Sequence, residues 1–208
     1  MKASFAALAG TMLIAVCPLA MAASSVDLAV TGAITPSACM PSISNDGVVD
    51  YGKISMQDLN PTGTTSLPTA MFKLGVNCEA PSLFALYSLD NNQPSLNQYF
   101  VMGLIDPTNW IGNYGLRLEN IVADVPSVFA IYSTDSGANW DAYTPGWKWG
   151  TNTLTAFGTA SMGQVVPTLI KDVSLDLLVD PVIFPKDLIP VGDTIALDGS
   201  ATFELRYL

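Results

Sequence analysis

A strict alternation of side chains over residues 26–34 most constrains how this chain folds. Every second position there is apolar or glycine: Val26, Leu28, Val30, Gly32 and Ile34. A repeat of two places these residues on one face of an extended strand and the intervening residues on the other. The pattern predicts a strand whose apolar face is buried, either in its own domain or in a neighbouring copy of the protein.

The first residues have the pattern of a secretory signal peptide. Lys2 precedes a long apolar run, and small residues close it at Ala20 and Ala22. We therefore expect residues 1–22 to be removed on export, which leaves a mature chain that begins at Ala23. The alternative is a lipoprotein attached through Cys17, which the valine just before that cysteine fits poorly.

The mature chain holds two cysteines, Cys39 and Cys78. Export places both where thiols oxidise, and an even pair predicts one disulfide bond. The alternative is two unrelated buried thiols. Because the chain has no histidine, two cysteines alone supply too few ligands for a metal site of this kind.

The charge of the chain limits its partners. The net charge of −10 argues against binding to nucleic acid or to an anionic membrane surface. No second apolar run approaches the roughly 18 residues that a membrane span requires. We expect one sizeable core, and therefore a single domain.

Short apolar segments separated by turn-forming residues predict an all-β fold. The expected strands are residues 48–54, 72–78, 83–89, 114–119, 128–133, 173–179 and 200–208. Pairing over residues 99–163 is not readable from the pattern. Pro181, Pro185 and Pro190 are expected to break regular pairing before the last strand.

The last expected strand runs to the end of the chain. Its apolar positions alternate as before: Ala201, Phe203, Leu205 and Tyr207. With no following strand to pair with, it leaves an open sheet edge and an uncovered part of the core. An extended segment added to that edge would satisfy both, and donation from copy to copy would build a filament.

These features resemble the pilin subunits of chaperone-usher fimbriae of Gram-negative bacteria, most closely a pilin-like group of secreted proteins of largely unassigned function. The resemblance rests on residues 26–35 with Gly32 seven positions before Cys39, on the Cys39 to Cys78 spacing, and on residues 194–207 with penultimate Tyr207. It is good at the two ends of the mature chain and weak between them.

The resemblance implies an incomplete immunoglobulin-like β-sandwich that is completed by donor-strand addition. Residues 23–35 would be the donor-strand extension, with Val26, Leu28, Val30, Gly32 and Ile34 as its inserted face, and residues 36–208 the sandwich domain. The acceptor groove and chaperone-binding strand would then be formed by Phe203, Leu205, Tyr207 and Leu208.

The implied function is that of a structural subunit of a fimbrium (pilus), which polymerises by donor-strand exchange at the cell surface and supports cell adhesion or biofilm formation. The implied partners are other copies or related pilin subunits, a periplasmic chaperone, an outer-membrane usher and a host or surface receptor. No cofactor is implied. The position of the subunit, in the shaft, as a minor subunit or at the tip, stays open.

A second hypothesis comes from the aromatic residues in the middle of the chain. Exposed aromatic rings stack on sugars or anchor protein contacts, and four such residues lie close in sequence: Trp140, Tyr143, Trp147 and Trp149. They would make the protein a secreted carbohydrate- or protein-binding module. The competing interpretation, which we favour, is packing in the core of the sandwich.

We expect no enzymatic activity. The absence of histidine excludes Ser-His-Asp and Cys-His arrangements. Asp176 and Asp180 are expected as ordinary charge on the solvent face of a strand. Ser133, Asp135, Gly137 and Trp140 match the turn motif known as the Asp box, but a propeller needs one such turn per blade. The motif therefore predicts a single structural turn.

Overall fold

The computed structural model describes residues 38–92, 98–106, 109–161, 163–190, 192 and 194–208. These residues form strands and short 3₁₀ turns and contain no α-helix, which confirms the all-β prediction. The strands are β1 Cys39–Ile43, β2 Thr65–Ser66, β3 Ala70–Ser82, β4 Phe84–Asp90, β5 Phe100–Asp106, β6 Asn109–Ala123, β7 Phe129–Ser133, β8 Asp141–Ala142, β9 Leu154–Ser161, β10 Gln164–Pro167, β11 Ile170–Ile183 and β12 Ala201–Tyr207. The turns are η1 Ser44–Gly47, η2 Met56–Asp58 and η3 Lys186–Leu188.

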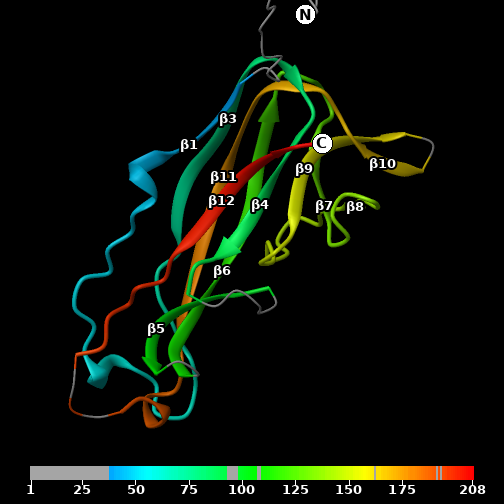
Figure 1. Cartoon of the computed structure of the whole chain (residues 1–208). Coiled ribbons are helices and arrows are strands. Elements are labelled where there is room, and N and C mark those ends of the chain that lie inside the picture. The colour runs from blue at the N-terminus through cyan, green and yellow to red at the C-terminus, as the bar shows by residue number, and fades with distance from the viewer. Residues whose placement is uncertain (1–37, 93–97, 107–108, 162, 191, 193) are drawn as a thin grey trace, which may run out of the picture. The chain divides into compact units, whose positions relative to one another are not determined.

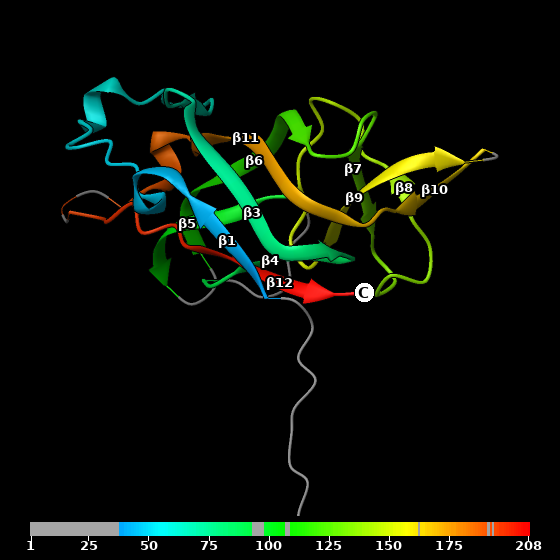
Figure 2. The ribbon, with the colours of Figure 1, turned by 90° about the horizontal axis from the view of Figure 1, so that it is seen from above.

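The strands form two antiparallel sheets, as an immunoglobulin-like β-sandwich does (Figures 1 and 2). One sheet has the order β1-β3-β11-β6-β5, with β2 paired to β11. The other has the order β12-β4-β9-β7-β8, with β10 paired to β9. Consequently β1 and β12, the first and last strands described, each lie at the edge of a sheet.

Alternation in β3 and β11 builds the core between the sheets. Phe72, Leu74 and Val76 are buried, and they pair in register with the buried Leu177, Leu175 and Val173. The opposite sheet contributes Phe84, Leu86 and Phe157 to the same cluster. One face of each strand is therefore apolar because it faces the other sheet, as the repeat of two predicts.

Two details of the strand prediction are wrong. Residues 48–54 form no strand: Gly52 takes a left-handed φ of +64°, and its N–H bonds to the Asp50 side chain. Pro181 does not break β11, because β3 stops pairing at Val179. The Pro181 carbonyl accepts from the Leu67 N–H. Because the N and C=O of one strand residue point to the same side, the proline nitrogen also points away from β6, and no hydrogen bond to β6 is lost.

Asp176 and Asp180 alternate with buried residues of β11 but are not ordinary surface charges. Their side chains are only 7% and 17% exposed. Lys73 lies 2.5 Å from Asp176, and Arg117 and Lys148 each lie 2.7 Å from Asp180. The expectation of solvated charge was wrong because Lys73 of β3, Arg117 of β6 and Lys148 of the segment between β8 and β9 lie against the two carboxylates.

Candidate functional site

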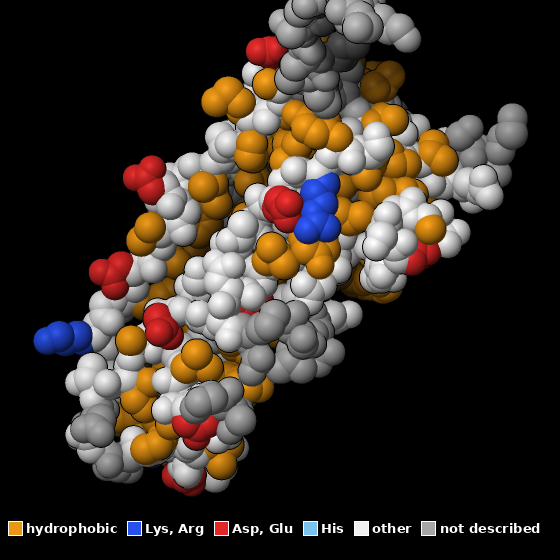
Figure 3. Space-filling model, viewed as in Figure 1, with side chains coloured by type: hydrophobic (Ala, Val, Ile, Leu, Met, Phe, Trp, Pro, Cys, Tyr) orange, Lys and Arg blue, Asp and Glu red, His pale blue; other side chains and the backbone are white. Residues whose placement is uncertain are grey.

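The candidate site is an apolar groove between the edges of β1 and β12. Its upper part has a volume of about 450 Å³ and is bordered by Ile43 of β1 and by Ala201 and Phe203 of β12. Core residues of the sheet that contains β1 form its floor: Phe72, Met102, Tyr114, Leu116, Leu177 and Val179. Figure 3 shows hydrophobic side chains along the strip between the two edges.

The groove continues past the last residue of β1 and the first residue of β12, toward the bottom of Figure 1. A second cavity of about 580 Å³ shares Val49, Tyr51 and Leu197 with the first. Residues 49–54 form one wall and residues 194–197 the other, with Ile111 and Ile183 among the floor residues. The two cavities therefore form one continuous groove, which we call the edge groove.

The walls of the edge groove carry backbone groups without sheet partners in the described part of the chain. Among the described strands, β1 pairs only with β3 and β12 only with β4, so residues 40–43 and 201–206 form no second ladder there. Two backbone groups of residues 49–54 and 194–199 have described hydrogen bonds. The Gly52 N–H donates to the Asp50 carboxylate, and the Asp198 carbonyl accepts from the Asn92 side-chain amide. A strand laid in the groove would meet bonding groups on both sides.

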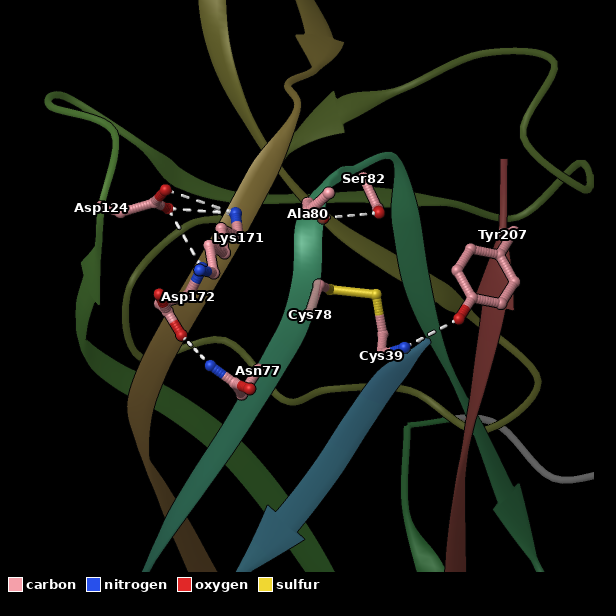
Figure 4. Close-up of a disulfide and its surroundings, with 9 residues drawn as sticks. All are labelled: Cys39, Asn77, Cys78, Ala80, Ser82, Asp124, Lys171, Asp172 and Tyr207. Atoms are coloured by element: carbon pink, nitrogen blue, oxygen red, sulfur yellow. Dashed lines mark hydrogen bonds between the residues drawn. A yellow bond between two sulfur atoms is a disulfide. The ribbon is translucent and has the colours of Figure 1, made fainter. Parts of the chain in front are cut away.

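A disulfide fastens the upper end of the groove (Figure 4). Cys39 lies directly opposite Cys78 in the β1–β3 register, and the two residues are bonded, which confirms the predicted disulfide. The Cys39 N–H also donates to the Tyr207 hydroxyl at 2.9 Å. Both edges of the groove are thus held together at this end.

The predicted acceptor residues lie on β12 and just after it. Phe203 lines the groove and stacks on Trp149, with ring centroids 4.8 Å apart. Leu205 packs against the core, and Tyr207 lies at the rim. Leu208 is exposed, and its N–H donates to the Leu83 carbonyl. The predicted donor residues Val26, Leu28, Val30, Gly32 and Ile34 lie outside the described residues.

Sequence reasoning missed the lower half of the edge groove. Residues 48–54 are expected as a strand of the sandwich and not as a wall of the groove, while Ile195 and Leu197 stand among turn formers and belong to no expected strand. The apolar character of both segments, Val49, Tyr51 and Ile54 in one and Ile195 and Leu197 in the other, was the available signal.

The structure divides the four aromatic residues of the middle region. Trp149 is 1% exposed and Tyr143 is buried, whereas Trp147 is 54% exposed and Trp140 is half-buried against the cluster around Ile131. The Trp149 N–H donates to the Leu116 carbonyl at 2.7 Å, and the Leu118 N–H donates to the Tyr143 hydroxyl at 3.2 Å. Tyr143 and Trp149 thus cover the part of β6 that β5 does not reach.

The Asp box motif forms the expected kind of turn. Asp135 accepts the Asn139 side-chain amide at 2.6 Å and the Asn139 N–H at 2.9 Å. These bonds lower the pKa of Asp135 to about 2, and the bond from the Asn139 side chain has the largest effect. Ser133 accepts the Gly137 N–H, and the Trp140 ring lies next to Gly137. All these bonds are internal to the turn.

The described residues contain no group of three or more His, Cys, Asp or Glu side chains placed to hold a metal ion. None of their helical turns has the length and apolar character needed to cross a membrane.

Comparison with known proteins places the chain in a family. It is 28% identical to Protein GltF of Escherichia coli (strain K12) over 237 aligned positions, which cover 91% of each chain. It is 26% identical to the uncharacterized protein YhcF of the same strain over 226 positions, covering 91% of this chain and 93% of YhcF. Residues 28–144 match a family described as proteins of unknown function (DUF1120). The chain therefore belongs to the DUF1120 family.

Proposed function

We propose that this protein is an exported fimbrial subunit of the chaperone-usher type, which polymerises when the N-terminal strand of the next copy enters the edge groove. The observation that carries the proposal is the groove itself, an apolar trough between β1 and β12, each of which pairs with a single strand among the described residues. The signal peptide pattern of residues 1–22 supports export.

The hydrogen-bonding capacity of the groove supports a strand as its occupant. One inserted strand would pair with β1 on one side and with β12 on the other, and would join the two sheets. Four apolar donor side chains, Val26, Leu28, Val30 and Ile34, would contribute on the order of 6 to 12 kcal/mol when buried, as an upper bound.

The extension is long enough for the groove. The described lining of the groove on this side runs from Thr194 to Phe203, ten residues that span about 33 Å when extended. The extension of residues 23–35 has thirteen residues and spans about 43 Å. The extension is therefore long enough to fill both halves of the groove.

Chain direction favours donation from a neighbour. β12 runs toward Cys39, since Tyr207 bonds to that residue. A segment joined to β1 at Cys39 would have to reverse within a few residues and run parallel to β12 to fill its own groove. A segment from another copy needs no such reversal and is free to run antiparallel to β12 and parallel to β1. Contacts passed on from copy to copy without closure form a filament.

The proposal also includes partners that act before assembly. An open edge with an apolar floor is a hazard for aggregation, so a periplasmic chaperone would occupy the groove until an outer-membrane usher passes the subunit to the fibre. At the cell surface, the fibre would support adhesion or biofilm formation.

The proposal predicts that a charge in the donor strand blocks assembly only on the inserted face. Val30→Asp places a carboxylate in the apolar groove, whereas Thr31→Asp places it one residue further on, facing away. In cells that make the protein, we expect heat-resistant polymers from the wild type and from Thr31→Asp, and none from Val30→Asp or from a deletion of residues 26–34. Gel electrophoresis without boiling measures them, and normal polymers from Val30→Asp would overturn the proposal.

A further inference from the structure

We propose that the loop around Trp147 binds a neutral oligosaccharide, with the Trp147 ring as the platform on which a sugar stacks. This inference does not depend on polymerisation. It rests on one exposed ring, on the hydrogen bonds that fix its backbone and on the cavity beside it.

Trp147 is exposed although its backbone is held firmly. Its side chain is 54% exposed, in contrast to the 1% of Trp149 two residues later. The Trp147 N–H donates to the Thr144 carbonyl at 3.0 Å, and its own carbonyl accepts the Tyr143 hydroxyl. The Trp149 N–H bonds to β6 at Leu116. An aromatic ring on a fixed backbone loses little conformational freedom on binding, which favours a role as a binding anchor.

A cavity of about 360 Å³ lies beside this ring. That volume is within the range of small-molecule sites. Three further aromatic residues line it: Tyr132, Tyr143 and Trp149. Other described lining residues have side chains with amide or hydroxyl groups: Gln98, Thr134, Thr151, Asn152 and Thr153. A sugar presents an apolar face to aromatic rings and hydroxyl groups to amides and alcohols. The lining offers both kinds of contact.

The charges around the cavity favour a neutral sugar. Lys148 is the one cation among the described lining residues, and it is bound to Asp180 at 2.7 Å. No carboxylate belongs to that described lining. A sulfated or acidic sugar would therefore find no uncommitted cation in this lining, while the chain as a whole carries a net charge of −10.

The cavity is separate from the edge groove, since the two share no lining residue. Trp149 lies between them: it lines the cavity and stacks on Phe203, which lines the groove. Sugar binding is therefore measurable on a subunit that does not polymerise, and its failure is distinguishable from failure of the polymer.

The test is calorimetric titration of the mature protein with three neutral sugars: cellotriose, maltotriose and N,N′,N″-triacetylchitotriose. We expect saturable binding of at least one of them, about tenfold weaker in Trp147→Ala, which corresponds to about 1.4 kcal/mol. Leu188→Ala is the matched control, because Leu188 is 70% exposed and lies in η3, away from the cavity lining. It should bind like the wild type.

A second variant protects the test against misfolding. Gln98 is exposed and lines the cavity beside Trp147, so Gln98→Ala should fold normally and weaken binding at least threefold, by roughly 0.6 kcal/mol. The proposal is overturned if none of the three sugars binds saturably. It is also overturned if every folded variant at Trp147 and Gln98 binds as tightly as the wild type.

Discussion

Asp180 connects three parts of the chain that are distant in sequence. Its carboxylate accepts from Arg117 of β6 at 2.7 and 3.2 Å, from Lys148 at 2.7 Å and from the Thr69 hydroxyl at 2.7 Å. The bond from Arg117 is the main cause that holds the pKa of Asp180 well below its usual range, and Lys148 and Thr69 act in the same direction. The ionised form is therefore the one that stabilises the fold.

This network predicts a stability difference that depends on pH. Asp180→Asn should lower the free energy of unfolding by about 1 to 2 kcal/mol at pH 7, since the side chains are partly screened by solvent. Because the folded pKa is lowered, the contribution is complete above the unfolded value near 3.8 and is lost as the pH falls toward the folded value.

Urea unfolding at several pH values measures this difference. The gap between wild type and Asp180→Asn should be constant from pH 7 to about pH 5 and shrink at lower pH. Asp141→Asn, at an exposed position of β8, is the control and should show almost no gap. A gap for Asp180→Asn that persists unchanged at low pH would contradict the assignment.

At the scale of elements, the two halves of the edge groove differ in whether their walls are strands. The upper half is bordered by β1 and β12, each already paired on one side. The lower half is bordered by residues 49–54 and 194–199, where few backbone hydrogen bonds are described. A strand in the groove would give these two segments the partners that make them strands as well.

Hydrogen exchange tests this expectation. In the isolated subunit, amides of residues 49–54 and 194–199 should exchange quickly, because unbonded and solvent-accessible amides are not protected. A synthetic peptide of residues 23–35 should slow them by about tenfold or more when bound. Amides of β3, which pair on both sides with β1 and β11, serve as the internal reference. Bound peptide without added protection in either segment would disprove a groove that is filled along its whole length.

At the scale of the whole molecule, the disulfide limits the unfolded chain more than the folded one. It joins residues separated by 39 positions, and in the folded state these residues are already neighbours in the β1–β3 ladder. Closing a loop of that length removes conformational freedom chiefly from the unfolded ensemble, an effect of about 4 kcal/mol in the chain-entropy model.

The disulfide prediction is measured with the double variant Cys39→Ala/Cys78→Ala. Its free energy of unfolding should fall by about 4 kcal/mol, less any strain in the bridge, because only the unfolded state gains freedom. The wild type treated with a reductant is the matched comparison and should lose a similar amount. A double variant as stable as the oxidised wild type would show that residues 39–78 are constrained by packing alone.

Sequence patterns predicted the strands best where buried and exposed side chains alternate along the chain. The alternation in residues 72–78, 173–179 and 200–208 corresponds to β3, β11 and β12, because one face of each strand contacts the other sheet. The same kind of pattern failed at residues 48–54, where Gly52 turns the chain. Of the edge groove, it predicted the β12 wall but not the wall formed by residues 49–54.

The sequence by itself therefore determined the strand class, the buried face of each regular strand and the disulfide, because alternation and cysteine number are properties of the chain alone. Only the tertiary structure decided which of two tryptophans two positions apart is buried. Trp149 is covered because it meets Leu116 and Phe203 from remote strands, while Trp147 is exposed. Such burial depends on residues far away in the chain, and no local pattern carries that information.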